Sequence, residues 1–167
     1  MIKPDRIGHV VIKVRDLERS KKFYGGLLGL TLMKDLPQFK AAFFASNGRD
    51  HHEIACFEVG ADAPAAQARQ IGLAHIAFRL RDEEHLRAAY KELKDNDVPI
   101  SYTVDHGVTK SVYFSDPDGN GLEVYCDNPP EYVAQLAEKA YVGMGKLDFA
   151  PTERGIAEAF AVRERKS

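Results

Sequence analysis

Two histidines and two glutamates recur at matching places in the two halves of the chain, and they predict a metal site. His9 aligns with His75 in one overlay of the halves, and Glu53 aligns with Glu123 in a second overlay with a slightly different offset. Imidazole and carboxylate groups are the protein ligands of divalent iron, manganese, nickel, cobalt and zinc. Because both halves carry such groups, the repeat predicts a cleft that binds a metal ion.

The preferred ligand set is His9, His75 and Glu123. Two neutral imidazoles and one carboxylate on separate strands match the facial triad of non-haem Fe(II) sites, which leaves positions open for substrate and dioxygen. One histidine on a buried strand is more often an ordinary core residue, but two at equivalent positions favour a site. An inward Glu123 also requires a positive partner, since glutamate is very rarely buried alone.

The elements that must position these residues follow the same order in each half: a strand, a helix and three more strands. In the first half we expect them at 7–14, 16–28, 30–35, 40–45 and 51–59. In the second half we expect them at 73–80, 82–95, 99–104, 110–115 and 121–126. The predicted fold class is therefore α+β, with two tandem βαβββ modules that form a metal-binding cleft.

Domain boundaries follow from this repeat. The modules span about 6–59 and 73–127, and together they make one predicted domain over 1–128. Residues 129–167 lie outside the repeat and are predicted to be a helical extension, with an amphipathic helix at 131–142.

Composition excludes several classes of function. The 167 residues carry a formal net charge of −2, so no basic face predicts a nucleic-acid partner. No apolar run is long enough to cross a bilayer, and the first residues do not read as a signal peptide. Cys56 and Cys126 lie in apolar strands and are expected to be buried free thiols, with a disulfide as the alternative. We therefore expect a cytoplasmic protein with no membrane partner.

Three segments resemble the vicinal oxygen chelate superfamily, which includes glyoxalases, bleomycin-resistance proteins and extradiol dioxygenases. The segments read GHVVIKVRDLERSKKFYGGLLGL, LAHIAFRL and YFSDPDGNGLEVY, and the resemblance extends over about residues 6–127. It implies paired βαβββ modules and a divalent metal that is chelated by two neighbouring oxygens of a substrate. Within the superfamily the chain is most similar to the single-domain type I extradiol catechol dioxygenases.

That similarity implies further site residues. Tyr113, ten residues before Glu123, takes the place of a pocket tyrosine, and His106 lies in a DHGV segment like those that approach substrate. His52 takes the place of an acid/base histidine, with His51 as the fallback. The implied cofactor is Fe(II), and the implied partners are an aromatic diol, dioxygen and a second copy of the chain in a homodimer. Three phenylalanines are candidates for binding the aromatic ring: Phe43, Phe44 and Phe78.

Two alternatives stay open at this point. If Glu53 points inward as a fourth ligand, the site resembles that of glyoxalase I or the epimerases, a lyase or isomerase site suited to Mn, Ni, Co or Zn. His52 and Glu53 are adjacent, and neighbouring residues of a strand point to opposite faces, so only one of them is expected to serve the pocket. We favour His52, because Tyr113 and His106 agree with it. The other alternative is a resistance-type protein that sequesters a ligand without turnover.

Overall fold

The computed structural model describes residues 1–67, 70–138, 143, 145–147 and 149. The chain divides into two compact units, each built on its own sheet. The first unit is Met1–Ile71 together with Asp116–Asn120, and the second is Gly72–Ser115 together with the residues from Gly121 onward.

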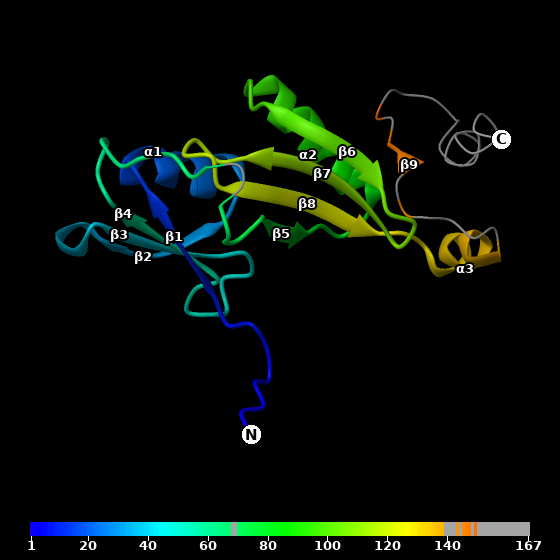
Figure 1. Cartoon of the computed structure of the whole chain (residues 1–167), viewed down its shortest axis with the longest axis horizontal. Coiled ribbons are helices and arrows are strands. Elements are labelled where there is room, and N and C mark those ends of the chain that lie inside the picture. Colours follow the sequence, from blue (N-terminus) through cyan, green and yellow to red (C-terminus); the bar gives the residue numbers. More distant parts are fainter. Residues whose placement is uncertain (68–69, 139–142, 144, 148, 150–167) are drawn as a thin grey trace. The chain divides into compact units, whose positions relative to one another are not determined.

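The first unit is a four-stranded sheet in the order β1-β4-β3-β2 (Figure 1). Its strands are β1 (Val10–Val14), β2 (Thr31–Leu36), β3 (Ala41–Ala45) and β4 (Ile54–Glu58). Its helical elements are α1 (Leu17–Lys21), the π-helical turn η1 (Lys22–Leu27) and the 3-10 turn η2 (Pro37–Phe39). β1 pairs with β4 in parallel, and the other pairs are antiparallel. The first and last strands of the unit therefore run side by side in the same direction.

Local sequence fixes the helix between β1 and β2. The Asp16 side chain accepts a hydrogen bond from the Arg19 amide at 2.9 Å and so caps the start of α1. Gly29, with φ of 69°, ends the helical segment in a left-handed conformation that favours glycine. Tyr24 from this segment is fully buried and packs against Phe44 of β3. The helical segment thus covers one face of the sheet and leaves the other face open.

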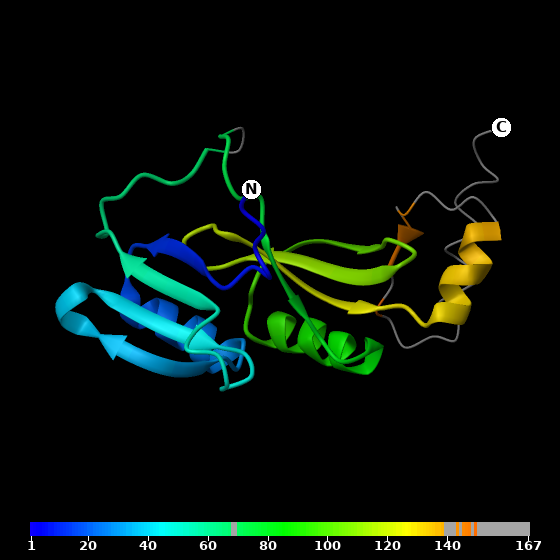
Figure 2. The ribbon, with the colours of Figure 1, turned by 90° about the horizontal axis from the view of Figure 1, so that it is seen from below.

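The second unit repeats this plan and adds a strand from the tail. Its strands are β5 (Ile76–Arg79), β6 (Ile100–Asp105), β7 (Thr109–Ser115), β8 (Gly121–Asp127) and β9 (Gly145–Lys146), in the order β5-β8-β7-β6-β9. Its helices are α2 (Glu83–Asp95), which begins at the Asp82 cap and runs along the sheet, and α3 (Pro130–Glu138) (Figure 2). β5 pairs with β8 in parallel, as β1 does with β4.

The predicted α+β fold with two βαβββ modules is confirmed. Several details differ from the sequence-based expectation. The strands expected at 7–14 and 73–80 begin only at Val10 and Ile76, so His9 and His75 lie just before their strands rather than on them. The strand expected at 51–59 begins only at Ile54, so the residues before it lie outside the strand. The helix expected at 131–142 spans Pro130–Glu138, and 139–142 lie outside the described residues. Beyond it, the extension supplies a strand, β9, as well as a helix, and most of its last residues are not described.

The loop between β7 and β8 belongs to the first unit through buried polar contacts. Asp116 accepts hydrogen bonds from the amides of Asp118 and Asn120 and from the Tyr24 hydroxyl at 2.9 Å. Asp118 in turn pairs with Arg15 and Arg19. Asp116 is 5% exposed, so these donors supply the partners that a buried carboxylate requires.

In the described part of the chain, no helix has both the length and the apolar character needed to cross a membrane. Both cysteines are buried free thiols, as expected. Burial raises the pKa of the Cys56 thiol to about 12, and it also raises the pKa of Cys126.

These thiols give a direct test of the two packed sheets. At pH 8 we expect both to react with a thiol reagent such as DTNB at least about a hundredfold more slowly in the folded protein than in guanidinium, because reaction needs an accessible thiolate. Two thiols per chain should then titrate after unfolding without a reductant. A Cys126→Ser variant isolates Cys56. Rapid reaction of folded Cys56 would contradict the packing of β4, and fewer than two thiols after unfolding would indicate a disulfide.

Candidate functional site

His75 and Glu123 meet in the second unit. His75 immediately precedes β5, and Glu123 lies in the middle of β8. His75 Nε2 lies 3.0 Å from Glu123 Oε2, with the imidazole partly exposed and the carboxylate nearly buried. The structure therefore brings together two of the three predicted metal ligands.

Strand register explains why these side chains share a face. In the parallel pair, Ala77 lies opposite Glu123, and His75 is two residues before Ala77. Because side chains alternate along a strand, His75 and Glu123 both point to the face opposite the buried Leu122 and Val124.

The donor atoms of this pair fit a divalent cation. Two donors bound to one ion at about 2.1 Å and at right angles lie roughly 3 Å apart, the spacing that His75 and Glu123 have. An imidazole nitrogen and a carboxylate oxygen are also a suitable donor set for iron, manganese or zinc. In the described part of the chain, no three histidine, cysteine or acidic side chains form a complete metal-binding group.

Tyr113 and His106 adjoin this pair. Tyr113 lies opposite Glu123 in the β7–β8 register, and its ring meets that of His75 edge-on at 5.3 Å between centroids. The Tyr113 hydroxyl lies 3.1 Å from His106 Nε2. Burial raises the pKa of Tyr113 to about 12, and the nearby Glu123 carboxylate adds to the shift. The hydroxyl is therefore protonated at neutral pH and can donate a hydrogen bond.

A buried aspartate fixes the loop that carries His106. Asp105 is 2% exposed and accepts hydrogen bonds from the Gly107 amide at 2.7 Å, the Asn128 side chain at 3.1 Å and the Tyr132 hydroxyl at 2.8 Å. Asn128 follows β8 and Tyr132 lies on α3, so the extension helps to hold the loop. The sequence predicted a role for His106 but none for Asp105.

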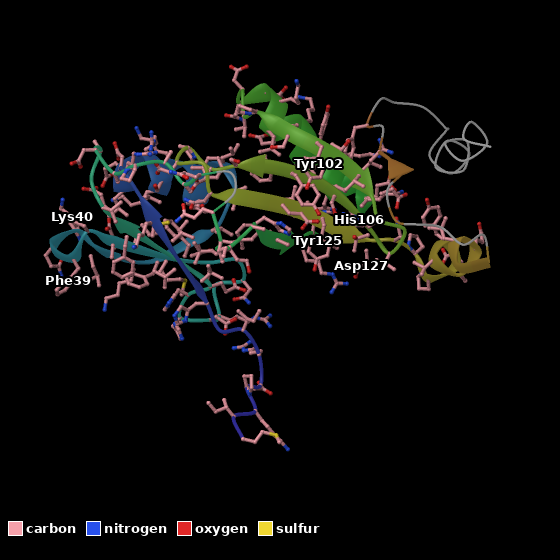
Figure 3. The ribbon with its side chains drawn as sticks, in the orientation of Figure 1. Phe39, Lys40, Tyr102, His106, Tyr125 and Asp127 are labelled. Carbon is pink, nitrogen blue, oxygen red and sulfur yellow. The ribbon has the colours of Figure 1, made fainter. Side chains whose placement is uncertain are left out.

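Two aromatic side chains extend the same face of the second unit. Tyr102 of β6 stacks on Tyr113 with 4.3 Å between ring centroids. Tyr125 lies two residues after Glu123 on β8 and therefore points to the same face. Figure 3 labels Tyr102, His106 and Tyr125 on this unit. Neither Tyr102 nor Tyr125 was among the residues expected from the sequence, because strand aromatics pack in cores more often than in sites.

The first unit gathers the other predicted histidines. His9 immediately precedes β1, and its ring lies 4.4 Å from that of His52 between centroids. His52 also contacts Phe43 edge-on at 5.0 Å, and its Nδ1 lies 2.6 Å from Nδ1 of His51. Burial, with smaller effects from His9 and His51, lowers the pKa of His52. His52 is therefore a neutral imidazole at pH 7.

Glu53 has a different role. Its Oε2 accepts a hydrogen bond from the Ser46 amide at 2.6 Å and another from the Ser46 hydroxyl. These two bonds tie the residue to the turn that follows β3. The Glu53 carboxylate thus supports the turn, while the adjacent His52 ring lies against His9 and Phe43.

The strand register does not match the overlay that aligned Glu53 with Glu123. In the second unit Glu123 lies opposite Tyr113, and in the first unit the residue opposite Phe43 is Ala55. Because Phe43 and Tyr113 correspond along β3 and β7, the counterpart of Glu123 is Ala55. The first unit therefore carries an alanine where a repeat-related fourth ligand would stand.

Of the three phenylalanines proposed to bind an aromatic ring, only Phe43 contacts a predicted site residue. Phe44 is fully buried beside Tyr24, on the face that the helix covers. Phe78 lies between Ala77 and Arg79 and so points away from the His75 face. The expectation that Phe44 and Phe78 bind an aromatic ring is therefore wrong. Each lies next to a residue that points to the face of the site, and neighbouring residues of a strand point to opposite faces.

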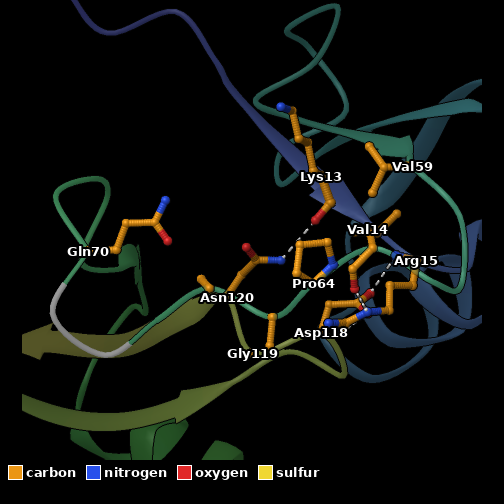
Figure 4. Close-up of a pocket in the computed structure, with 12 residues that line it drawn as sticks. Lys13, Val14, Arg15, Val59, Pro64, Gln70, Asp118, Gly119 and Asn120 are labelled. Atoms are coloured by element: carbon orange, nitrogen blue, oxygen red, sulfur yellow. Dashed lines mark hydrogen bonds and ion pairs between the residues drawn. The ribbon is translucent and has the colours of Figure 1, made fainter.

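A separate cavity of about 410 Å³ lies within the first unit (Figure 4). Residues 63–66, Gln70 and the β7–β8 loop contribute to its lining, with Arg15 held between the Ala63 carbonyl and Asp118. Its described lining residues include none of the predicted site residues. The cavity is therefore distinct from both histidine clusters.

The chain is similar in sequence to a large protein superfamily and to several of its members. The model of the Glyoxalase/Bleomycin resistance protein/Dioxygenase superfamily matches residues 6–124. The chain is 33% identical over 124 residues to biphenyl-2,3-diol 1,2-dioxygenase 3 of Rhodococcus globerulus, covering 74% of this chain and 64% of that protein. It is 33% identical over 137 residues to catechol-2,3-dioxygenase of Bacillus subtilis, covering 81% of this chain and 46% of that protein. The chain thus spans less than two thirds of the length of either dioxygenase.

Relatives with other activities match as well. The metallothiol transferase FosB of Staphylococcus saprophyticus is 31% identical over 121 residues, covering 71% of this chain and 75% of that protein. Among solved structures, a glyoxalase/dioxygenase from Nostoc punctiforme superposes with a TM-score of 0.65 at 23% identity, covering 77% of this chain and 97% of that one. This last likeness is one of fold alone.

The Asp105 anchor yields a stability prediction. An Asp105→Ala change leaves three buried donors without their acceptor, so we expect it to lower the free energy of unfolding by about 3 kcal/mol or more. A Tyr132→Phe change removes one donor together with its need for a partner and should cost only about 1 kcal/mol. Urea unfolding measures both. Equal, small effects would contradict the role given to Asp105.

Proposed function

Because the chain belongs to the glyoxalase/bleomycin resistance protein/dioxygenase superfamily, we propose that it is a metal-dependent dioxygenase that opens the ring of a catechol-type aromatic diol. The observation that carries this proposal is the hydrogen-bonded pair of Tyr113 and His106 beside the His75–Glu123 pair. A metal-binding pair and a proton-handling pair share one face of the second sheet. Relatives named as dioxygenases of aromatic diols support the same class of substrate.

The proposed metal ligands are His9, His75 and Glu123, and the proposed metal is Fe(II). When bound, Fe(II) would supply a Lewis acid for the two diol oxygens and a position for dioxygen. The donor atoms of His75 and Glu123 lie 3.0 Å apart, a spacing that two ligands of one ion can adopt.

Proton handling falls to the remaining residues. A diol must lose a proton to chelate a metal well, and the neutral imidazole of His52 can accept it. The Tyr113 hydroxyl, protonated at neutral pH, can redirect its one hydrogen bond from His106 to developing negative charge on an oxygen. His106 contacts that hydroxyl and can exchange a proton with it. Catalytic roles are therefore proposed for His52, Tyr113 and His106.

The arrangement favours this function over a lyase or isomerase that uses Glu53 as a fourth ligand. Glu53 is bonded to Ser46, and Ala55 occupies the position that corresponds to Glu123. We also propose residues 1–128 as the catalytic domain and 129–167 as its extension. The homodimer and the cytoplasmic location stay predictions.

Activity tests the proposed reaction directly. After anaerobic loading with Fe(II), we expect the protein in air to convert catechol or 2,3-dihydroxybiphenyl to a yellow ring-opened product. Tyr113→Phe and His52→Gln should each lower kcat by about a hundredfold or more, the usual contribution of a positioned acid or base. Lys94→Gln serves as a control on the exposed surface of α2 and should retain activity. Absence of product with several catechols, together with hemithioacetal or acyl-CoA turnover in the presence of Ni, Co or Mn, would contradict the proposal.

The iron content of two variants distinguishes Glu123 from Glu53 as the metal ligand. We expect Glu123→Ala to lose at least about 90% of the bound Fe(II) after gel filtration, since one of three protein ligands is removed, and Glu53→Ala to keep the wild-type content. Metal analysis by mass spectrometry gives the ratio of iron to protein, and a thermal melt confirms that both variants fold. Loss of iron in Glu53→Ala with retention in Glu123→Ala would overturn the assigned ligand set.

A further inference from the structure

We propose that the segment after α3 sets the protonation pattern of His106 through the carbonyl of Gly143. This contact makes His106 Nδ1 a donor and leaves Nε2 as the acceptor of the Tyr113 proton. Its catalytic consequence rests on the proposed dioxygenase function, but the protonation pattern itself does not.

The hydrogen-bond partners of His106 determine which of its two ring nitrogens carries the proton. His106 Nδ1 lies 2.9 Å from the Gly143 carbonyl oxygen. A carbonyl oxygen only accepts hydrogen bonds, so Nδ1 must carry the proton. A neutral imidazole has one such proton, and Nε2 is then a bare acceptor. Nε2 lies 3.1 Å from the Tyr113 hydroxyl, so a bare Nε2 makes the tyrosine the donor in this pair, in competition with the Glu123 carboxylate, which also interacts with that hydroxyl.

Position 143 has to be a glycine for this contact to form. Its φ of 72° lies in the left-handed region, which is strained for other residues. A Cβ atom at this position would come within 2.9 Å of the His106 carbonyl oxygen, and the obstructing atom belongs to the backbone. The segment can therefore approach the His106 backbone only because residue 143 has no side chain.

Flanking contacts hold Gly143 in register with the loop. β9 begins two residues later, with Gly145 paired to Asp105 and Lys146 paired to Val104 of β6. The Thr103 hydroxyl also donates to the Leu147 carbonyl at 2.9 Å. On the other side of the loop, Asp105 is bonded to Tyr132 of α3. His106 is thus fixed between α3 and β9, and the extension supplies a positioning residue, Gly143, to the candidate site.

The full chain without metal gives the first test. Long-range proton–nitrogen NMR on protein with ¹⁵N-labelled histidine, recorded at pH 8 where an ordinary imidazole is neutral, reports which ring nitrogen carries the proton. A His106→Gln variant assigns the signal by its loss. We expect a protonated Nδ1 and a bare Nε2 in His106. A proton on Nε2, or an equal mixture of the two forms, would overturn the inference.

A matched pair of variants gives the second test. Gly143→Ala introduces the clash with His106, whereas Gly29→Ala has nearly the same positive φ, 69°, and open space around the added methyl group. We expect Gly143→Ala to change the His106 nitrogen signals and to lower kcat about tenfold or more, with KM within about twofold. Gly29→Ala should leave both unchanged. Unaltered nitrogen signals in folded Gly143→Ala would contradict the inference.

The two proposals can fail separately. If the wild-type protein opens no aromatic diol, the proposed function fails, while the NMR signals of His106 still decide the role of Gly143. If ring opening occurs but His106 carries its proton on Nε2, the function stands and the role of Gly143 is rejected.

Discussion

Parallel pairing of β5 with β8 is the constraint on which the candidate site depends. It brings the residue before the first strand of the second module, His75, beside a carboxylate in the middle of the last strand, Glu123. The antiparallel partner β7 then adds Tyr113 on the same face. Because side chains alternate along a strand, a shift of β8 by a single residue would turn Glu123 toward the opposite face of the sheet, away from His75 and Tyr113.

Carboxylates elsewhere in the chain do structural work that Glu123 does not. Asp105, Asp116 and Glu53 each accept bonds from backbone amides and from a side-chain hydroxyl, and each fixes a loop or turn. Glu123 instead contacts the His75 imidazole and the Tyr113 hydroxyl on an open face of its sheet, and it fixes no loop or turn. A buried carboxylate next to a nitrogen donor is the arrangement that a divalent cation stabilises, which is why the metal is proposed here.

Much of the fold and part of the candidate site could be predicted from the sequence, because hydrophobic periodicity, helix caps and the internal repeat indicate local structure. Both modules, the helix starts at Asp16 and Asp82, and the meeting of His75 with Glu123 follow from such signals. The pairing of Glu53 with Glu123 failed for a physical reason: Phe44 pairs with Ile54 ten residues later, whereas Phe114 pairs with Leu122 only eight residues later. The connection between β3 and β4 is therefore two residues longer than the one between β7 and β8, and an overlay of the two halves without a gap cannot align the strands on both sides of it. Gly143 was also beyond reach, since a carbonyl contact across 37 residues leaves no pattern in the side chains.

The central proposal is that His9, His75 and Glu123 bind one iron. A crystal structure of the protein loaded anaerobically with Fe(II), recorded at the iron absorption edge, tests it most directly. The account predicts a single strong anomalous peak per site, bonded to imidazole nitrogens of His9 and His75 and to the carboxylate of Glu123, with open positions beside it. A peak bonded to Glu53, or one that lacks either His75 or Glu123, would contradict the account.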